Sequence, residues 1–502
     1  MKKHQVNRAI ALVLLLSAAA CGQKTRQPAV AGAFYPADAN ELRNMVDGFL
    51  AQAAPPAVAG PVVALISPHA GYQFSGAVAA YSYALLKGRK PERVVVIAPS
   101  HIEAFGFSAV YDGDAYATPL GTVPVDKAFA AKLASMSPLI KLSSQGHVAS
   151  GGQGEHALEV QLPFLQRVLG QFKLVPIIMG DQSYDACRAL GVALAKLIQG
   201  SDTLIVASSD LSHFHPYDEA VKIDHKTLKA IQEWDYLSMS RNFESRVWEA
   251  CGGGPIVAAM IASERLGATE AVLLKYANSG DVTGDHSRVV GYGALALVKA
   301  AGGQASAAPP FSLTQAERDE LLKLARTSVE TAVRQHRAYD FKGSNSEALM
   351  QERGAFVTLK KNGELRGCIG YVAPVKPLSL TVRDVATYAA LRDSRFSPVE
   401  PAELGQLQYE VSVLSPLRRV LDIKQIEVGK HGLVMRRGER EGLLLPQVPV
   451  EQQWNRMTFL AETCRKAGLP ADAWKDEQTD IFMFTALVFG DHTPAAGPPA
   501  RH

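Results

Sequence analysis

The fold is indicated most clearly by Val62-Val-Ala-Leu-Ile-Ser-Pro-His69, an apolar run that ends at a turn and a histidine. Three more apolar runs have the same form: Val94–Ala98, Lys173–Met179 and Thr203–Ala207. Continuous runs of this length are typical of strands buried on both faces of a parallel sheet. Helical patterns at Ser75–Leu86 and Asp185–Ile198 alternate with them. This alternation predicts βαβ units and an α/β parallel-sheet domain.

Metal-binding residue types follow three of these runs. His69 and His101 come after the first two, and Asp210 and His213 follow Thr203–Ala207. In such sheets ligands bind beyond the carboxyl ends of the strands, so we expect these side chains at one edge. Cys251 stands before the helical pattern that begins with Pro255, where the helix dipole favours a thiolate. A thiolate with neutral imidazoles suits Fe(II), Cu or Zn.

The other histidines are interpreted individually. His156 and Glu159 are three residues apart and would share one face of a helix, as site residues or as residues that cap and brace it. We expect His215, next to a proline, to be structural. Four others are expected at the surface, namely His4, His147, His225 and His336.

The N-terminus has the pattern of a leader. Lys2, Lys3 and Arg8 precede the apolar run Ala9–Ala20, which is too short to span a bilayer. Cys21 after small residues resembles the bacterial lipoprotein box. We expect a signal peptide at 1–20, lipidation of Cys21, a tether at 21–28, and an exported lipoprotein anchored in the membrane and facing the periplasm or cell exterior. A plain secretory signal cut near Ala20 is the alternative.

The charge balance argues against a nucleic-acid partner. Lys and Arg number 52 and Asp and Glu 49, which gives +3. Removal of the three leader cations leaves 52 − 3 = 49 on each side, so the mature chain has no basic excess. Five cysteines in 502 residues also exclude a small disulfide scaffold.

Two domains are expected on either side of an Ala/Gly/Ser/Pro linker at 301–310. The first spans 29–300, the second 311–490, and a disordered tail covers 491–502. The second domain opens with a helix capped by Ser312 or Thr314, and the remaining patterns predict strands. Asn362-Gly363 predicts a tight hairpin, and the mix is α+β.

A possible second site lies in Leu365-Arg-Gly-Cys-Ile-Gly370. Arg366 and Cys368 are its candidates, because a strand cysteine between glycines permits close approach of a ligand. The alternative is that Cys368 is a small buried filler between tightly packed glycines.

Several segments of the first region together resemble the MEMO family, whose bacterial members are called AmmeMemoRadiSam system protein B. They are Ala29–Asp38, Ser67–Gly76, Ala98–His101, Glu155–Leu165, Ser208–Phe214, Cys251–Ile256 and Ser279–Gly293. The resemblance implies a fold like that of the class III extradiol dioxygenases, which hold Fe(II) with two histidines and a carboxylate. It implies His69, His101 and Cys251 as metal ligands, with Asp210 and His213 as a second polar group. Because a cysteine replaces the carboxylate, ring cleavage does not follow.

The second region resembles the AMMECR family, AmmeMemoRadiSam system protein A, through Leu365–Gly370, Leu391–Val399 and the segments Gly429–Arg436 and Leu443–Trp454. The pair of families implies a radical SAM protein as partner.

Three functions are compatible with these patterns. We favour an enzyme, a metal-dependent oxidoreductase or dioxygenase-like protein with one metal ion, Fe(II) before Cu or Zn, acting on an unknown small molecule or peptide. Its catalytic residues would be His213 as acid or base, with Asp210, His156 and Glu159. The alternatives are a non-catalytic module that binds a peptide or small ligand, and a membrane-tethered scaffold for a radical SAM partner.

Overall fold

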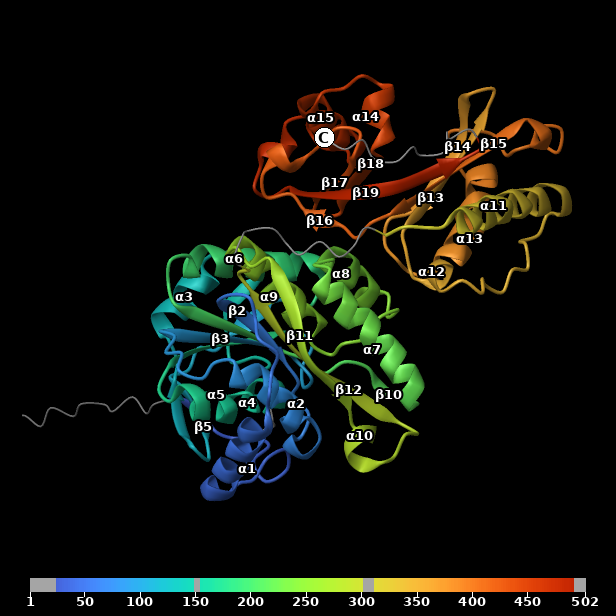
Figure 1. Ribbon diagram of the computed structural model, residues 1–502. Helices are drawn as coiled ribbons and strands as arrows, with labels where there is room; N and C mark the ends of the chain where they lie inside the picture. Colours follow the sequence, from blue (N-terminus) through green and yellow to red (C-terminus); the bar gives the residue numbers. More distant parts are fainter. Residues whose placement is uncertain (1–23, 149–153, 301–310, 492–502) are drawn as a thin grey trace, which may run out of the picture.

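The computed structural model describes residues 24–148, 154–300 and 311–491. The expected signal peptide, Cys21, the linker at 301–310 and the tail after Asp491 lie outside the described residues. Two domains pack against each other, the first drawn in blue to yellow-green and the second in gold to red (Figure 1). Within the described ranges, no helix combines the length and apolar character that a bilayer span requires.

A nine-stranded mixed sheet forms the centre of the first domain, in the order β10-β12-β2-β9-β3-β8-β4-β7, with β11 beside β12. Its four central strands are parallel and match the four apolar runs of the sequence: β2 (Val62–Ser67), β9 (Thr203–Ser208), β3 (Arg93–Pro99) and β8 (Lys173–Met179). The α/β class is therefore confirmed.

The predicted parallel sheet is found at this centre, but the whole sheet is mixed, because antiparallel strands flank the centre on both sides. β12 (Val289–Val298) pairs antiparallel with β2, and β4 (Ser108–Val110) pairs antiparallel with β8. The other strands of this sheet are β7 (Ile140–Leu142), β10 (His213–His215) and β11 (Glu270–Asn278). A separate three-stranded sheet contains β1 (Thr25–Arg26), β5 (Ala115–Thr118) and β6 (Gly121–Pro124). β11 and β12 form a long hairpin, and hairpin strands are necessarily antiparallel.

Helices cover both faces of this sheet, as alternation along β3 shows. Val94 and Val96 pack in one core with α1 (Ala39–Gln52), α2 (Tyr72–Ala84) and α5 (Leu162–Leu169). Val95 and Ile97 pack in the opposite core, with four helices: α6 (Tyr184–Ile198), α7 (Tyr217–Gln232), α8 (Tyr236–Glu244) and α9 (Gly253–Arg265). Shorter helices are α3 (Lys127–Ala134), α4 (His156–Glu159) and α10 (Gly280–Thr283). Burial on both faces explains why the central strands lack polar alternation.

The second domain is α+β, as predicted, around a seven-stranded sheet in the order β14-β13-β15-β19-β17-β18, with β16 beside β19. Its strands are β13 (Ala355–Lys361), β14 (Glu364–Tyr371), β15 (Leu407–Leu414), β16 (Arg418–Arg419), β17 (His431–Arg437), β18 (Arg440–Leu444) and β19 (Asp480–Gly490). Its helices are α11 (Gln315–Gln335), α12 (Glu347–Met350), α13 (Leu378–Leu391), α14 (Gln447–Glu451) and α15 (Arg456–Lys466). Asn362 and Gly363 both have positive φ, 54° and 83°, as the predicted tight hairpin requires.

A buried ionic cluster joins the two domains at Asp480, whose side chain is 1% exposed. Its carboxylate accepts hydrogen bonds from Tyr184 (2.9 Å) and Arg188 (2.6 Å) of the first domain. Arg265 and Arg419, one from each domain, each lie 3.4 Å away. Burial alone would raise the pKa of Asp480, but the hydrogen bond to Arg188 and the arginine charges outweigh it and lower the pKa. The carboxylate is therefore held ionised inside the interface.

Both ends of the folded region differ from the expected boundaries. Thr25 and Arg26 form β1, which pairs with β5, so the expected tether at 21–28 already belongs to the domain from Thr25 on. Asp491, expected in the tail, accepts a hydrogen bond from the Tyr409 backbone N–H at 2.9 Å and pairs with Arg326. Strand pairing fixes Thr25 and Arg26, and the hydrogen bond and ion pair fix Asp491. Composition reveals none of these contacts.

His147 was expected at the surface, and the structure contradicts this. Its side chain is 0% exposed and lies between Tyr116, which hydrogen bonds to Nδ1, and the Ala109 carbonyl, 2.9 Å from Nε2. Burial lowers the pKa of His147 to about 3, so the ring is neutral.

Candidate metal centre

The ligand atoms of His69, His101 and Cys251 lie within 4.8 Å of one another. His69 follows the end of β2, His101 follows the end of β3, and Cys251 stands just before α9. The closest pair is His69 Nε2 and Cys251 Sγ, 3.1 Å apart, and the two imidazole rings meet edge to face with centroids 5.2 Å apart. The structure therefore brings together the three residues expected as metal ligands.

The order of the strands explains this meeting. β2, β9 and β3 are adjacent and parallel, so their carboxyl ends share one edge of the sheet. Cys251 reaches the same edge through Gly252, whose N–H donates to Ser209 Oγ at 2.9 Å. A Cβ at Gly252 would lie 2.2 Å from the Ser208 carbonyl oxygen. Only glycine lets the backbone come this close, and so the thiol is held over the strand ends.

A hydrogen-bond chain fixes the tautomer of His69. The Ser208 hydroxyl donates to the Ala157 carbonyl (2.6 Å) and accepts from the Gln161 side-chain amide (2.7 Å). Its remaining acceptor position faces His69 Nδ1 at 2.9 Å, so Nδ1 carries the proton. Nε2 is left as the lone-pair atom that faces Cys251. Partners of this kind orient the histidine ligands of metal sites.

Glu155 fixes the orientation of the His101 ring, although it is not among the site residues expected from the sequence. Its carboxylate accepts from His101 Nδ1 (2.9 Å) and from the His101 backbone N–H (2.5 Å). It also caps α4 by accepting from Ala157 N–H at 2.9 Å. Burial would raise its pKa, but the hydrogen bond and charge of His101 lower it to about 2. Its position before the first residue of a helix was the available signal.

His156 belongs to the same cluster. Its ring stacks on His101 with centroids 4.6 Å apart and lies 5.4 Å from His69. Its Nδ1 is 3.2 Å from Glu155, so His101, Glu155 and His156 form a second group that could share an ion. Burial, followed by the charge of His69, lowers the pKa of His156 to about 4.

Asp210 and His213 flank the ligands. Asp210 accepts from the His69 backbone N–H at 2.7 Å, and its own N–H donates to Cys251 Sγ at 3.3 Å. His213 Nδ1 is 2.9 Å from the Leu211 carbonyl and must donate to it, which leaves Nε2 free of the ring proton. His213 lies near enough to affect the pKa values of both His69 and Asp210.

Glu159, named with these residues from the sequence, faces another part of the domain. It is completely buried and forms an ion pair with Arg26. It also accepts from Ala29 N–H at 2.8 Å, from Val30 N–H at 3.1 Å and from the Tyr35 hydroxyl. This arrangement corresponds to the bracing alternative, because all these partners belong to the N-terminal segment.

His215, expected to be structural, contacts Glu249 through Nε2 at 2.8 Å. His225 and His336 are exposed, as expected.

The second-domain candidates, Arg366 and Cys368, lie two residues apart on β14 and have different partners. Arg366 forms an ion pair with Glu403 at 2.9 Å and donates to the Ser397 carbonyl at 2.9 Å. Cys368 Sγ is 3.3 Å from the Thr358 hydroxyl, and its backbone N–H donates to Asp393 at 2.8 Å. Burial raises the pKa of Cys368, which makes it a neutral thiol. These contacts are those of a well-packed strand.

The protonation states of the first-domain ligands suit metal binding. Burial lowers the pKa of His69 well below its usual value, so the imidazole is neutral. The helix dipole was expected to favour a thiolate at Cys251, but burial and the nearby Asp210 raise the pKa of this thiol. The Cys251 thiol therefore keeps its proton, which lies between Sγ and His69 Nε2, where a metal ion would bind. Binding of a metal ion to such a thiol releases the proton. Cys187, Cys251, Cys368 and Cys464 are all unpaired thiols.

Comparison with known proteins shows the family to which the chain belongs. The family model "Memo-like protein" matches residues 26–296 and the AMMECR1 model matches residues 322–489. A MEMO1 family protein, MK0963 of Methanopyrus kandleri, is 40% identical over 281 residues, 54% of this chain and 98% of the relative. One from Nitrosopumilus maritimus is 38% identical over 279 residues, 54% and 99% of the two chains.

Among solved structures, the uncharacterised protein PH0010 of Pyrococcus horikoshii is 40% identical over 35% of this chain and 91% of its own, with a TM-score of 0.34. The matched family models cover both folded regions in turn. The chain thus belongs to the Memo-like family and carries an AMMECR1 domain behind its Memo-like domain.

Proposed function

We propose that this protein is a metal-dependent oxidoreductase in which His69, His101 and Cys251 hold one ion, Fe(II) in the first place and Cu or Zn as alternatives. The observation that carries the proposal is that Nδ1 of both imidazoles is engaged in a hydrogen bond while Nε2 of His69 faces the thiol at 3.1 Å. Imidazole and thiolate together are ligands that these metals accept.

The chemistry of such an ion is to bind O₂ or a substrate at positions that the protein leaves open, as in dioxygenase-like sites. The chain's own residues prepare that position. Asp210 fixes the backbone at His69, and its N–H stabilises sulfur charge at Cys251. His213, with Nε2 free of the ring proton, is placed to accept a proton from a bound substrate. His156 stacks on the ring of His101, with the ring centroids 4.6 Å apart.

The test is the metal content of the mature chain, purified without oxygen, in wild type and Cys251→Ala. Cys464→Ala is the matched control, because Cys464 lies in the core of the second domain. We expect near one Fe or Cu per chain in wild type and control, and loss in Cys251→Ala. If wild type binds no metal after reconstitution, the enzyme proposal fails, and a ligand-binding or scaffold function takes its place.

The scaffold alternative is supported by a different observation, the fusion of Memo-like and AMMECR1 domains in one chain. The partner bound by this scaffold would be a radical SAM protein of the same system. Recovery of such a protein with the wild-type chain, equally from Cys251→Ala, would favour the scaffold.

We also propose that the protein is exported and anchored through lipid on Cys21, supported by the leader pattern. Labelled palmitate should be incorporated by wild type and not by Cys21→Ala. Because β1 begins at Thr25, a lipid on Cys21 would hold the first domain close to the membrane surface.

A further inference from the structure

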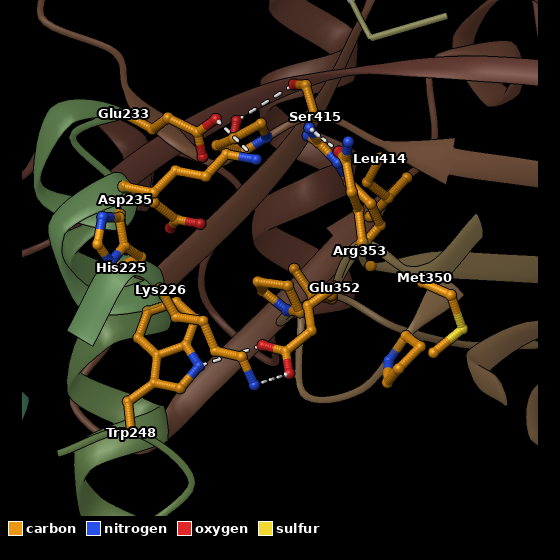
Figure 2. Close-up of a pocket in the computed structure, with 18 of the residues that line it drawn as sticks. His225, Lys226, Glu233, Asp235, Trp248, Met350, Glu352, Arg353, Leu414 and Ser415 are labelled. Atoms are coloured by element: carbon orange, nitrogen blue, oxygen red, sulfur yellow. Dashed lines mark hydrogen bonds and ion pairs between the residues drawn. The ribbon is translucent and has the colours of Figure 1, made fainter. Parts of the chain in front are cut away.

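A cavity of about 340 Å³ lies between the two domains, away from the metal ligands. α7 and the segment up to Trp248 line it on the side of the first domain, and residues 350–354 and 414–416 line it on the other. Figure 2 shows His225, Lys226 and Trp248 on one wall and Met350, Glu352 and Arg353 on the opposite wall. Neither domain could form this cavity alone.

Arg353 is the unusual residue of this cavity. Among the described residues its guanidinium has no carboxylate within 4 Å, and it donates a hydrogen bond of 3.4 Å to the Gln351 side chain. Its Nε is buried without a hydrogen-bond partner. Burial lowers the pKa of Arg353 from its usual value, although an arginine keeps its charge. A partly buried charge without an ion-pair partner is costly, and an anion bound beside Arg353 would offset this cost.

The acidic residues that line the cavity already have partners. Glu352 binds Lys226 at 2.7 Å, and Glu233 lies 4.0 Å from Lys229 in the next helical turn. Asp235 caps α8 by accepting from Ser238 N–H. Lys222, which is exposed on the same helix, has no ion pair within the described ranges. Arg353 and Lys222 therefore have no carboxylate within ion-pair distance among the described residues, although Glu233 and Asp235 lie near enough to Arg353 to oppose the lowering of its pKa.

Part of the lining is apolar. The residues concerned are Trp248, Met350, Val372, Pro374, Pro377 and Leu414. Arg353, Glu233 and Ser415 also line an adjoining cavity of about 460 Å³, into which Phe311, Met483 and Leu487 project. A pocket with one convergent charge and apolar walls is typical of sites for small organic ligands.

We propose that a small organic oxyanion, a carboxylate or a phosphate ester with an apolar body, binds between the two domains with its charged group on Arg353. The bidentate donors of a guanidinium match either oxyanion, and Lys222 adds to the attraction. The apolar body lies against Trp248 and Met350. Because both domains line the site, the ligand stabilises their packing as well as filling the pocket.

A purely structural role for Arg353 would rest on its contact with Phe311, whose ring centre is 4.5 Å from the guanidinium carbon. The two roles differ in what Arg353→Met does to the free protein. This variant keeps the apolar stem over Phe311 and removes an unpaired charge, so a ligand-binding role predicts no loss of thermal stability without ligand. A structural role predicts a clear loss.

The experiment titrates the mature full chain with phenylacetate, phenyl phosphate and inorganic phosphate by calorimetry, with thermal shift in parallel. We expect saturable binding of at least one phenyl compound, tighter than that of inorganic phosphate. Arg353→Met should weaken it about tenfold or more. Arg392→Met, which changes the same charge at an exposed position outside the lining, should leave it unchanged.

Lys222→Met, an exposed change that does not threaten folding, should weaken binding about two- to fivefold. The proposal is overturned if neither phenyl compound binds saturably, if inorganic phosphate binds as tightly, or if Arg353→Met binds like wild type. Metal content is not part of this readout, so the outcome is independent of the proposed metal centre.

Discussion

Glu155 and Glu159 stand four residues apart on the same short segment, and we predict that their replacement by Gln has opposite consequences. Glu155→Gln removes the charge that holds His101 Nδ1, while Gln can still accept one of the hydrogen bonds. Loss of such a partner lowers metal affinity about 10- to 100-fold. The cost in folding should stay near that of a weakened helix cap, about 1 kcal/mol.

Glu159→Gln leaves the metal ligands unchanged but leaves the Arg26 charge without an ion-pair partner. Arg26 is 2% exposed, and within the described ranges Glu159 is its one carboxylate partner. Breaking a buried ion pair from one side costs about 3–5 kcal/mol. The variant should therefore lose much stability and, while folded, bind metal like wild type.

Both quantities can be measured on the same samples. Competition with a chelator gives the metal affinity of the reconstituted protein under anaerobic conditions, and urea unfolding of the metal-free protein gives the free energy of unfolding. Arg26→Met combined with Glu159→Gln should recover part of the stability, because no charge remains unpaired. Equal metal affinity for Glu155→Gln and wild type would refute the assignment of Glu155 as the residue that orients His101.

Three further predictions concern the site, the interface and the core. Gly252→Ala should abolish metal binding and destabilise the first domain by several kcal/mol, since its Cβ would lie 2.2 Å from the Ser208 carbonyl oxygen. Gly48→Ala is the control: its Cβ meets open space, so this change should stabilise α1 by about 1 kcal/mol. Thermal unfolding measures both effects. Asp480→Asn should lower the free energy of unfolding by about 3–5 kcal/mol and expose the domain interface to proteolysis. Because the pKa of Asp480 is lowered in the folded protein, the stabilisation by its carboxylate is present above the unfolded value of 3.8 and is lost as pH falls through the folded pKa. Unfolding measured at descending pH should show this loss in wild type and not in the variant. The pKa of His147 is about 3 in the folded protein and 6.5 in the unfolded chain, so the unfolded chain binds the extra proton and the free energy of unfolding declines as pH falls from 6.5 toward 3. His147→Gln keeps a donor for the Ala109 carbonyl and an acceptor for the Tyr116 hydroxyl, so the free energy of unfolding of this variant should depend less on pH in that range. An unchanged pH dependence would contradict the assignment of His147 as a buried neutral ring.

Much of the site was predictable because its signals are local. A buried strand requires a continuous apolar run, and a residue that follows it must lie at the sheet edge, so His69 and His101 could be placed from their neighbours in sequence. Pro255 and the preceding glycines marked the start of α9 and thereby placed Cys251. The Asn362-Gly363 hairpin was equally local, because only the two residues of the turn determine its type.

What the sequence could not decide was which way a polar side chain faces. Glu155 and Glu159 have the same side-chain chemistry and lie four residues apart, yet one holds His101 and the other Arg26. His147 is buried because Tyr116 and the Ala109 carbonyl, both distant in sequence, supply its hydrogen bonds. No period or turn signal contains that information.

The sequence by itself determined the two domains, the central strands and the residues that could bind a metal, since apolar periodicity and turn chemistry act over a few residues. Tertiary structure alone decided the antiparallel outer strands, the orienting role of Glu155 and the cavity around Arg353. These features depend on contacts between segments up to hundreds of residues apart, such as Arg188 with Asp480. The free energy of a buried charge depends on the partners that packing brings to it, and packing is a property of the whole fold.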